Sequence, residues 1–302
     1  MSYADTVFNS ISTEILKNGT TTKRQKVRPV WPDTGEPAHT IKIFGVSNKY
    51  DLRKEFPAIT SRRTALKSAF DEILWIYQKK SNDIHDLNSH IWDEWADENG
   101  KIGKAYGYQV GSPRVDHRLK PGEVVDNAYP SMRIQDNLVI MDQMDGLLYG
   151  LKHDPFSRRH KISLWNVDEL TEMNLQPCCY DLTFNVTDEN EDKLVLNLTL
   201  NQRSQDMLAA NNWNTAQYAL LLMAVAQVSG MTAGVLQHNI TDAHIYDRHV
   251  EIIENLIARE TYPAPKVWLD PSITNFYDFT PEHLHVEDYQ HGPQVKNIPI
   301  AV

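Results

Sequence analysis

The chain has 302 residues, 41% of them hydrophobic, a formal net charge of −10 and two cysteines. This length suits one large domain, and the acidic balance argues against a broad electrostatic surface for nucleic acid. Two adjacent cysteines exclude a disulfide framework of the secreted type. No apolar run approaches the roughly 18 residues that span a bilayer, and the first residues look like a polar helix rather than a signal peptide. We therefore expect a soluble, cytoplasmic protein that does not bind membranes.

The first half of the chain predicts helices with one stretch of strand between them. Residues 4–18 are typical of a helix that ends at Gly19, and residues 39–52 alternate in the manner of strands. Residues 61–80 and residues 131–153 have apolar side chains at helical spacing, so each predicts a helix. Residues 111–130 are rich in proline and charge, and their pattern assigns them no role.

The second half predicts more strands than helices. The expected strands are residues 160–167, 180–188, 193–204, 266–269 and 284–289, with residues 188–192 as a hairpin connection. Residues 213–229 are almost all apolar and predict a helix that is buried on most sides. A strand-to-helix unit starts at residue 244. Because helices and strands mix without a regular βαβ rhythm, we expect an α+β fold with a large mixed sheet. No linker divides the chain, which predicts one domain over residues 1–302.

Cys178 and Cys179 follow a proline and precede a predicted strand. If this strand pairs with residues 193–204 about their connection, the numbers of opposed residues sum to roughly 380. Arg203 then lies near Cys178, where its charge would stabilise a thiolate, the reactive form of cysteine. A reactive thiol and a buried structural cysteine both remain possible on these residues alone.

Two further pairs of residues have a ligand-binding and a plain structural interpretation. Arg158 and Arg159 lie in a predicted loop, where both side chains can converge on an anion or stay solvated on the surface. Trp92 and Trp95 are three residues apart, and they predict an aromatic wall for a flat ligand or ordinary core packing.

Ten segments taken together resemble, in order, the blocks of the folate-dependent thymidylate synthases. They are FPAITSRR, DEILWIY, HIWDEWADENG, GKAYGYQ, PFSRRHKISLWN, LQPCC, NQRSQDM, NWNTAQYALL, DAHIYDRH and IPIAV. The resemblance runs from about residue 5 to residue 302 in register, so the chain is identified as a member of this family. It implies a thymidylate synthase-like fold and a homodimer formed through the large sheet.

The resemblance also implies the reaction. A one-carbon unit passes from 5,10-methylenetetrahydrofolate to C5 of dUMP and is reduced to methyl by the same folate, giving dTMP and dihydrofolate with no metal. Cys178 would add to C6 of the pyrimidine as a soft nucleophile. Arg203 would hold the thiolate and bind phosphate. Glu72 would move protons through water, and Tyr106 would assist removal of the C5 proton.

The remaining site residues follow from the same matches. Asn214 would read the uracil edge, because a carboxamide both accepts from N3–H and donates to O4. The other substrate-binding residues implied are Arg28, Arg203, Ser204, Asp206, His244 and Tyr246, with Arg158 and Arg159 reaching the phosphate bound by the partner subunit. The folate-binding residues implied are Trp92, Trp95, Asp206, Ala210, Trp213 and Ala301, the last in a mobile tail that closes over the ligand.

The chain departs from the commoner family pattern in two places. Cys179 stands where many members have a histidine, and alternation along a strand predicts that it faces away from the substrate. Residues 210–214 read ANNWN in place of Gly-Leu-Pro-Phe-Asn, which puts Trp213 where a phenylalanine is usual. Water entering there would give 5-hydroxymethyl-dUMP instead of dTMP, but the retained Trp92 favours methylation. A silent relative that binds nucleotide or RNA, and a cysteine hydrolase, are weaker alternatives.

Overall fold

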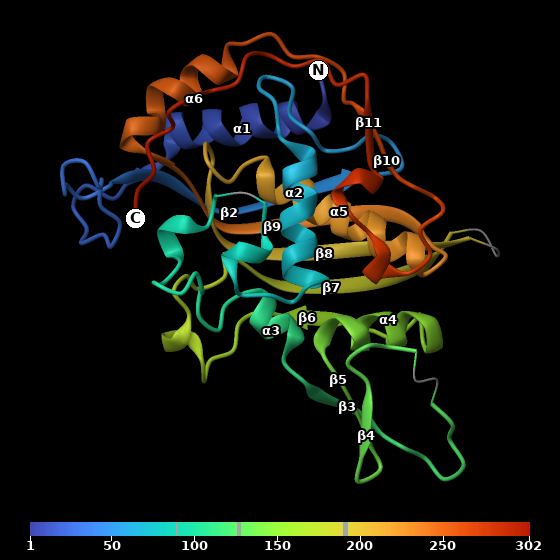
Figure 1. Ribbon diagram of the computed structural model, residues 1–302. Coiled ribbons are helices and arrows are strands. Elements are labelled where there is room, and N and C mark those ends of the chain that lie inside the picture. The colour runs from blue at the N-terminus through green and yellow to red at the C-terminus, as the bar shows by residue number, and fades with distance from the viewer. Residues whose placement is uncertain (89, 126–127, 190–192) are drawn as a thin grey trace.

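The computed structural model describes residues 1–88, 90–125, 128–189 and 193–302. The largest sheet among them has the strand order β1-β2-β9-β8-β7-β6, and it crosses the middle of the molecule with α2 and α5 in front of it (Figure 1). Its strands are β1 (Thr20–Thr21), β2 (Thr40–Asp51), β6 (Lys161–Ser163), β7 (Cys179–Asp188), β8 (Leu194–Asp206) and β9 (Thr232–Tyr246). Neighbouring strands are antiparallel except β8 and β9, which are parallel. The expected mixed sheet is confirmed.

The helices pack on this sheet and on each other. They are α1 (Tyr3–Asn18), α2 (Leu66–Tyr77), α3 (Gly107–Gly111), α4 (Gln143–His153), α5 (Trp213–Val228) and α6 (Val250–Ile257). The short 3₁₀ turns are η1 (Ile84–Asp86), η2 (Asp93–Trp95), η3 (Leu170–Glu172), η4 (Asp247–His249), η5 (Phe276–Asp278) and η6 (Pro281–His283). Among the described residues, no helix is both long enough and apolar enough to cross a membrane.

Helix α5 is the crossover that a parallel pair of strands requires, and it connects β8 to β9. The consecutive residues Leu220, Leu221 and Leu222 are all fully buried. Successive helical residues point about 100° apart, so burial of three in a row means that protein surrounds the helix. It lies between the sheet and α2, which confirms the helix predicted over residues 213–229 and its burial.

Helix α1 confirms the prediction for residues 4–18 and shows its cause. Ser2 and Asp5 form a capping box, in which each side chain bonds to the backbone N–H of the other residue. Gly19 follows the last residue of the helix. Strands β10 (Lys266–Leu269) and β11 (Leu284–Glu287) form a separate antiparallel pair close to the expected positions.

The helix predicted over residues 131–153 is wrong in its first half. Strands β4 (Arg133–Gln135) and β5 (Leu138–Met141) occupy that half and form a small sheet with β3 (Arg114–Arg118), in the order β3-β5-β4. Asp136 and Asn137 have positive φ angles of 51° and 60°, as a tight two-residue hairpin turn requires. The small sheet projects below the main sheet in Figure 1 and has its own core around Val139 and Met141. The segment 111–130 therefore supplies a strand of this projection.

Two other boundaries differ from the expectation. Helix α2 begins at Leu66 rather than residue 61, and β6 covers residues 161–163 of the predicted strand 160–167. The hairpin of β7 and β8 is confirmed, with opposed residues within two positions of the predicted register. A bulge between Cys179 and Asp181 reduces this difference by one position at the Cys179 end of the hairpin. Of the predicted connection 188–192, residues 190–192 lie outside the described part of the chain.

Candidate active site

The two cysteines have different surroundings. Cys178 precedes β7 and is partly exposed, whereas Cys179 is the first residue of β7 and lies buried in the main hydrophobic core. Burial raises the pKa of the Cys178 thiol, while the charges of Arg203 and Arg28 and a hydrogen bond from Tyr106 lower it. Burial raises the pKa of Cys179 well above its usual value. The pKa of Cys178 is raised overall, but two arginine charges and Tyr106 act against burial there, whereas burial dominates at Cys179.

Arg203 lies beside Cys178, as the hairpin register predicted. Its backbone N–H donates to Cys178 O at 2.9 Å. Its guanidinium donates from Nε to Pro177 O at 3.1 Å and from Nη2 to Gln176 O at 2.8 Å. These bonds tie the segment that carries Cys178 to the end of β8. Arg203 thus sets the position of the thiol as well as the charge around it.

Glu72 on α2 is held between two indoles. Trp92 Nε1 donates to its Oε1 at 3.1 Å, and Trp213 Nε1 donates to its Oε2 at 2.7 Å. Glu72 is 5% exposed, and burial raises its pKa to about 7, although hydrogen bonds from Trp213, Gln217 and Trp92 oppose this rise. At neutral pH such a carboxyl group is present in both protonation states, which suits a group that accepts and returns protons.

Tyr106 lies between Cys178 and Trp92 and contacts both. Its hydroxyl oxygen accepts from the backbone N–H of Cys178 at 3.1 Å, and its ring centroid lies 4.9 Å from that of Trp92. The residue has a φ of 44°, unusual for a side chain of this size. Burial raises the pKa of its phenol well above 10, so the hydroxyl keeps its proton and donates to the thiol.

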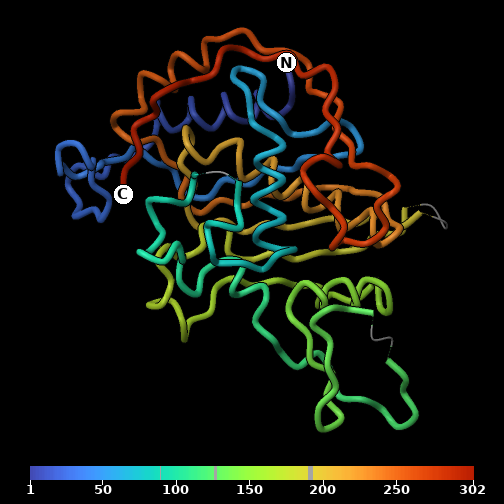
Figure 2. The backbone as a smooth tube through the Cα atoms, viewed as in Figure 1, coloured from blue at the N-terminus to red at the C-terminus, as the bar shows by residue number. Residues whose placement is uncertain are grey.

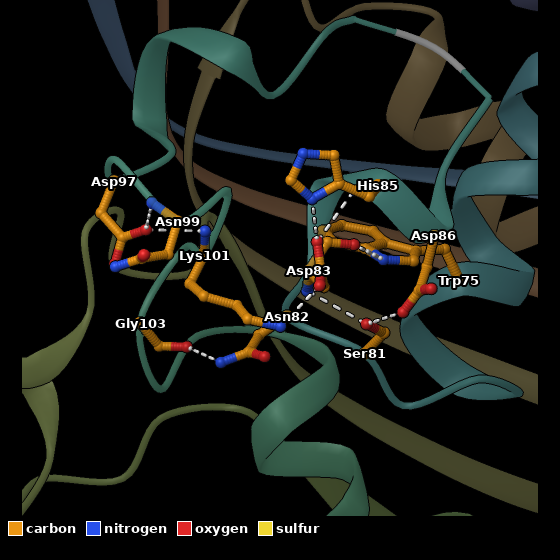
Figure 3. A network of polar contacts seen from close by, with 10 residues as sticks. All are labelled: Trp75, Ser81, Asn82, Asp83, His85, Asp86, Asp97, Asn99, Lys101 and Gly103. Atoms are coloured by element: carbon orange, nitrogen blue, oxygen red, sulfur yellow. Dashed lines mark hydrogen bonds and ion pairs between the residues drawn. The ribbon is translucent and has the colours of Figure 1, made fainter.

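Trp92 and Trp95 lie in the segment between Asp83 and Lys101. A polar network around these two end residues, drawn in Figure 3, connects the ends of the segment. Asp83 accepts from Lys101 Nζ at 2.6 Å, and the backbones of these two residues form a β-bridge. The indole of Trp75, on α2, donates to Asp83 O at 2.9 Å. The hydrogen bond from Lys101 is the largest of the effects that hold the pKa of Asp83 well below its usual range. Between these anchors, the rings of Trp92 and Trp95 meet edge to face with centroids 5.8 Å apart.

Asn214, in the first turn of α5, belongs to a network of amides. Its Oδ1 accepts from Gln202 Nε2 at 3.1 Å, and its Nδ2 donates to Gln217 Oε1 at 3.2 Å. The Oε1 of Gln202 contacts Nε2 of His238 at 2.7 Å. The sequence did not single out Gln202, Gln217 or His238. Gln202 falls inside the matched segment NQRSQDM, but neither spacing nor charge indicates its role.

The end of β9 carries the residues expected at the sugar. His244 Nδ1 contacts Asp242 Oδ1 at 2.9 Å, and its ring meets that of Tyr246 edge to face at 5.2 Å. Burial raises the pKa of Tyr246 to about 12. Asp242, on the same strand, therefore holds the imidazole of His244, which in turn packs against the ring of Tyr246. The charge of Arg28 acts on Tyr246 as well as on Cys178, which places Arg28 at the same site.

Asp206, at the end of β8, faces His249 and His244. Burial raises the pKa of its carboxyl group, but the hydrogen bond and charge of His249 outweigh burial, and the pKa is lowered overall. His249 Nε2 contacts Pro299 O at 2.8 Å. Further along, Val302 exchanges backbone hydrogen bonds with Val30 in both directions, at 2.8 and 3.1 Å. Figure 2 shows the final segment running across the top of the molecule to the loop that precedes β2.

The remaining predicted residues have these positions. Arg158 and Arg159 lie exposed in the loop between α4 and β6, and they are not among the described cations whose charge acts on Cys178. Ala210 is partly buried and its carbonyl oxygen accepts from Asn214 N at 3.0 Å. Ser204 lies on β8 and is partly buried, and Ala301 lies partly buried beside Val302. The described residues contain no cluster of three or more His, Cys, Asp or Glu side chains that could hold a metal ion.

The residues present suit a reduced folate. The indoles of Trp92 and Trp95 offer apolar rings beside the carboxyl group of Glu72, and Asp206 offers a largely buried carboxylate that can accept from N–H groups of a flat heterocycle. Together with the thiol of Cys178, the nearby Arg203 and Arg28 and the amide of Asn214, this arrangement suits a transferase that acts on an anionic ligand.

Comparison with known proteins gives the family. The thymidylate synthase family model matches residues 6–302. Over 298 residues, 98% of both chains, this chain is 41% identical to the thymidylate synthase of Bacillus licheniformis and 37% identical to that of Bacillus phage phi3T. The structure of thermostable thymidylate synthase A from Bacillus subtilis superposes over the whole of both chains with a TM-score of 0.86 and 37% identity. The chain belongs to the thymidylate synthase family.

The activity follows from these matches over nearly the whole chain. The protein is a methyltransferase that makes dTMP from dUMP, with methylenetetrahydrofolate as cosubstrate. The matches favour this activity over the hydroxymethylase that the change at residues 210–214 left open.

Proposed function

We propose that this thymidylate synthase works through covalent attack of Cys178 on C6 of dUMP. The observation that carries the proposal is the set of donors and cations around the thiol, namely Arg203, Arg28 and Tyr106. Addition of sulfur to C6 moves an electron pair toward C5 and O4, so that C5 becomes a nucleophile for the one-carbon unit. The folate supplies that unit and the two electrons that reduce it to methyl.

Glu72 and Tyr106 handle the protons of the reaction. The carboxyl group of Glu72, with a pKa of about 7, exchanges protons with O4 and with the folate through water. The indoles of Trp92 and Trp213 hold both of its oxygens in place. Tyr106, hydrogen-bonded at Cys178, is placed to assist the loss of the proton from C5.

The nucleotide is oriented from both ends. Asn214 reads the uracil edge, and His244 and Tyr246 bond the hydroxyl of the deoxyribose. Arg28, Arg203 and Ser204 bind the phosphate. A phosphate dianion pairs well with guanidinium groups, and such a local cluster outweighs distant acids because screening limits their reach to about 8 Å.

The phosphate site is completed in a homodimer formed through the large sheet, where Arg158 and Arg159 of each subunit reach the phosphate bound to the other. Two features support this arrangement. Phe44 on β2 is 87% exposed, which is typical of an apolar side chain that a partner subunit covers. On the same sheet, a ladder of polar side chains crosses from Ser47 through Asn239 to Asn201, at 2.8 and 3.0 Å.

The cosubstrate lies against the tryptophans. Trp92, Trp95 and Trp213 pack beside its rings and Asp206 accepts from the pterin, while Ala210 and Ala301 border the site. Residues 1–302 act as one catalytic domain, since the main core draws on buried residues from Ala4 to Leu284. Trp92 is buried and bonded to Glu72, which keeps water from the methylene group and favours methyl as the product over hydroxymethyl.

Incubation with dUMP and methylenetetrahydrofolate tests the reaction. The absorbance rise of dihydrofolate, together with dTMP identified by mass, is the expected result. A product heavier by one oxygen without dihydrofolate would show a hydroxymethylase, and nucleotide binding without product would show a silent relative.

A further inference from the structure

Four side chains from three elements form a continuous hydrogen-bonded relay, which starts in the core and ends at the proposed uracil-reading residue. His238 comes from β9, Gln202 from β8, and Asn214 and Gln217 from the first turns of α5. His238, Gln202 and Gln217 are almost completely buried. The relay therefore has little contact with solvent, and each of its members must find its partners within the protein.

One backbone carbonyl group, that of Ser204, determines which atoms of the relay donate and which accept hydrogen bonds. Gln202 places one amide atom 2.8 Å from Ser204 O, which can only accept a hydrogen bond. That amide atom must be Nε2, and the opposite atom, which faces His238 Nε2 at 2.7 Å, must be Oε1. Reversing the amide of Gln202 would bring two oxygen atoms together at Ser204 and leave both buried groups unsatisfied.

His238 agrees with this polarity. Burial lowers its pKa to about 3, so the ring is neutral and carries a single proton. Because Gln202 Oε1 can only accept, that proton is on Nε2. Nδ1 is then an acceptor, and it lies 3.4 Å from the hydroxyl of Thr215.

The orientation of Gln202 in turn determines the orientation of the Asn214 amide. One hydrogen of Gln202 Nε2 is used by Ser204 O, and the other points to Asn214 Oδ1 at 3.1 Å. If Asn214 were reversed, its NH2 group would face the NH2 group of Gln202. On the other side, Asn214 Nδ2 would be replaced by an oxygen facing Gln217 Oε1. Gln202, whose own orientation is fixed by Ser204 O, thus disfavours the reversed amide, whereas Gln217 Nε2 has no partner in normal hydrogen-bond geometry within the described part of the chain to fix its orientation.

We propose that Gln202 and His238 are specificity-determining residues, which lock the amide of Asn214 in the orientation that accepts uracil and rejects cytosine. The inference rests on the proposed role of Asn214. In the locked orientation, the second lone pair of Oδ1 accepts from N3–H and the second hydrogen of Nδ2 donates to O4. Cytosine has an acceptor at N3 and an amino group at C4, so both contacts become repulsive. Asn214 alone could turn its amide to suit either base.

The test compares binding of dUMP and dCMP, measured by titration calorimetry without folate. Gln202→Glu replaces the donor with an acceptor, which attracts Asn214 Nδ2 and favours the reversed amide. Gln202→Met keeps the volume and removes the polarity. The matched control is Gln205→Met, which changes another buried glutamine of β8 whose Oε1 is bonded to Asn211. Asn214→Asp reports on the reading residue itself.

The preference for dUMP over dCMP should fall about tenfold in Gln202→Met, the equivalent of one hydrogen bond at about 1.4 kcal/mol, and further in Gln202→Glu. Gln205→Met should keep the wild-type ratio, whatever it costs in stability. If Gln202→Glu does not fold, Gln202→Met decides. If the Gln202 variants keep the wild-type preference for dUMP over dCMP while Asn214→Asp changes it, the role of Gln202 is refuted and that of Asn214 stands. A wild-type protein that binds both nucleotides equally would overturn the proposed role of Asn214 and this inference with it.

Discussion

Trp213 donates its indole N–H to Oε2 of Glu72 at 2.7 Å, from the first residue of α5 to the buried face of α2. The sequence predicted that Trp213 packs beside the folate, at a position where a phenylalanine is usual in the family. A phenylalanine cannot donate, so Trp213 gives the carboxylate of Glu72 a second indole donor besides Trp92. The departure at residues 210–214 thus acts on Glu72, the proposed general acid-base group.

Replacing Trp213 by phenylalanine should therefore shift the pH dependence of the reaction. The indole hydrogen bond lowers the pKa of Glu72, so its loss raises that pKa further above about 7. The ionisation seen in the pH profile of kcat/KM should move upward, and kcat should fall about tenfold. Trp95→Phe is the matched control, since it removes an indole near the site whose ring meets Trp92 rather than the carboxylate. Equal shifts in both variants would count against the assignment.

The two cysteines should respond differently to the same change. Cys178→Ser should lower kcat by about a thousandfold or more, because it removes the proposed nucleophile. Cys179→Ser should keep most of the activity and unfold more easily, by about 1–3 kcal/mol, because it puts a hydroxyl into the core. Steady-state rates and urea unfolding measure both effects. Comparable loss of activity in the two variants would refute the choice of Cys178.

Glu72 should make the protein less stable as the pH rises. Its pKa is about 7 in the folded state and 4.5 in the reference state, so the folded protein binds the proton more tightly. Stability then decreases between about pH 4.5 and pH 7 and is constant with respect to this group above that range. The loss is about 3 kcal/mol.

Urea unfolding at pH 5 and pH 8 checks this prediction against Glu72→Gln, in which the group cannot ionise. The free energy of unfolding of the wild-type protein should fall from pH 5 to pH 8 relative to that of Glu72→Gln. If the difference in the free energy of unfolding between the two proteins is the same at both pH values, Glu72 keeps an ordinary pKa.

The shared phosphate site predicts complementation between two inactive proteins. Cys178→Ser lacks the proposed nucleophile, and the double variant Arg158→Ala/Arg159→Ala lacks the arginines proposed to bind the phosphate of the partner subunit. In a mixed dimer, one site combines the intact Cys178 of one subunit with the intact arginines of the other. Mixing equal amounts after unfolding and refolding should restore about a quarter of wild-type activity, since half of the dimers are mixed and each has one complete site.

Sedimentation of the wild-type protein is the companion measurement. A monomer at micromolar concentration, or mixing that restores nothing while both parents refold as dimers, would exclude the shared site.

Local sequence determined much of the fold. Helix α1 follows from its capping box and its terminal glycine, and the burial of α5 follows from its continuous apolar run. The β7–β8 hairpin was predictable because two alternating runs flank a polar connection, and it was enough to place Arg203 beside Cys178. Residues 131–141 were misassigned to a helix, since the apolar side chains of a short strand pair also fit helical spacing.

The tertiary structure decided how the site residues act on one another. No spacing in the sequence shows that Trp213 and Trp92 hold the same carboxylate, or that burial moves its pKa to about 7. The relay through Gln202 depends on β8 and β9 lying parallel with α5 packed over them. Hydrogen-bond direction and desolvation depend on which atoms meet in space, whereas periodicity and turn chemistry are written along the chain. The sequence alone therefore determined the family, most of the elements and the candidate residues, and packing decided their protonation and orientation.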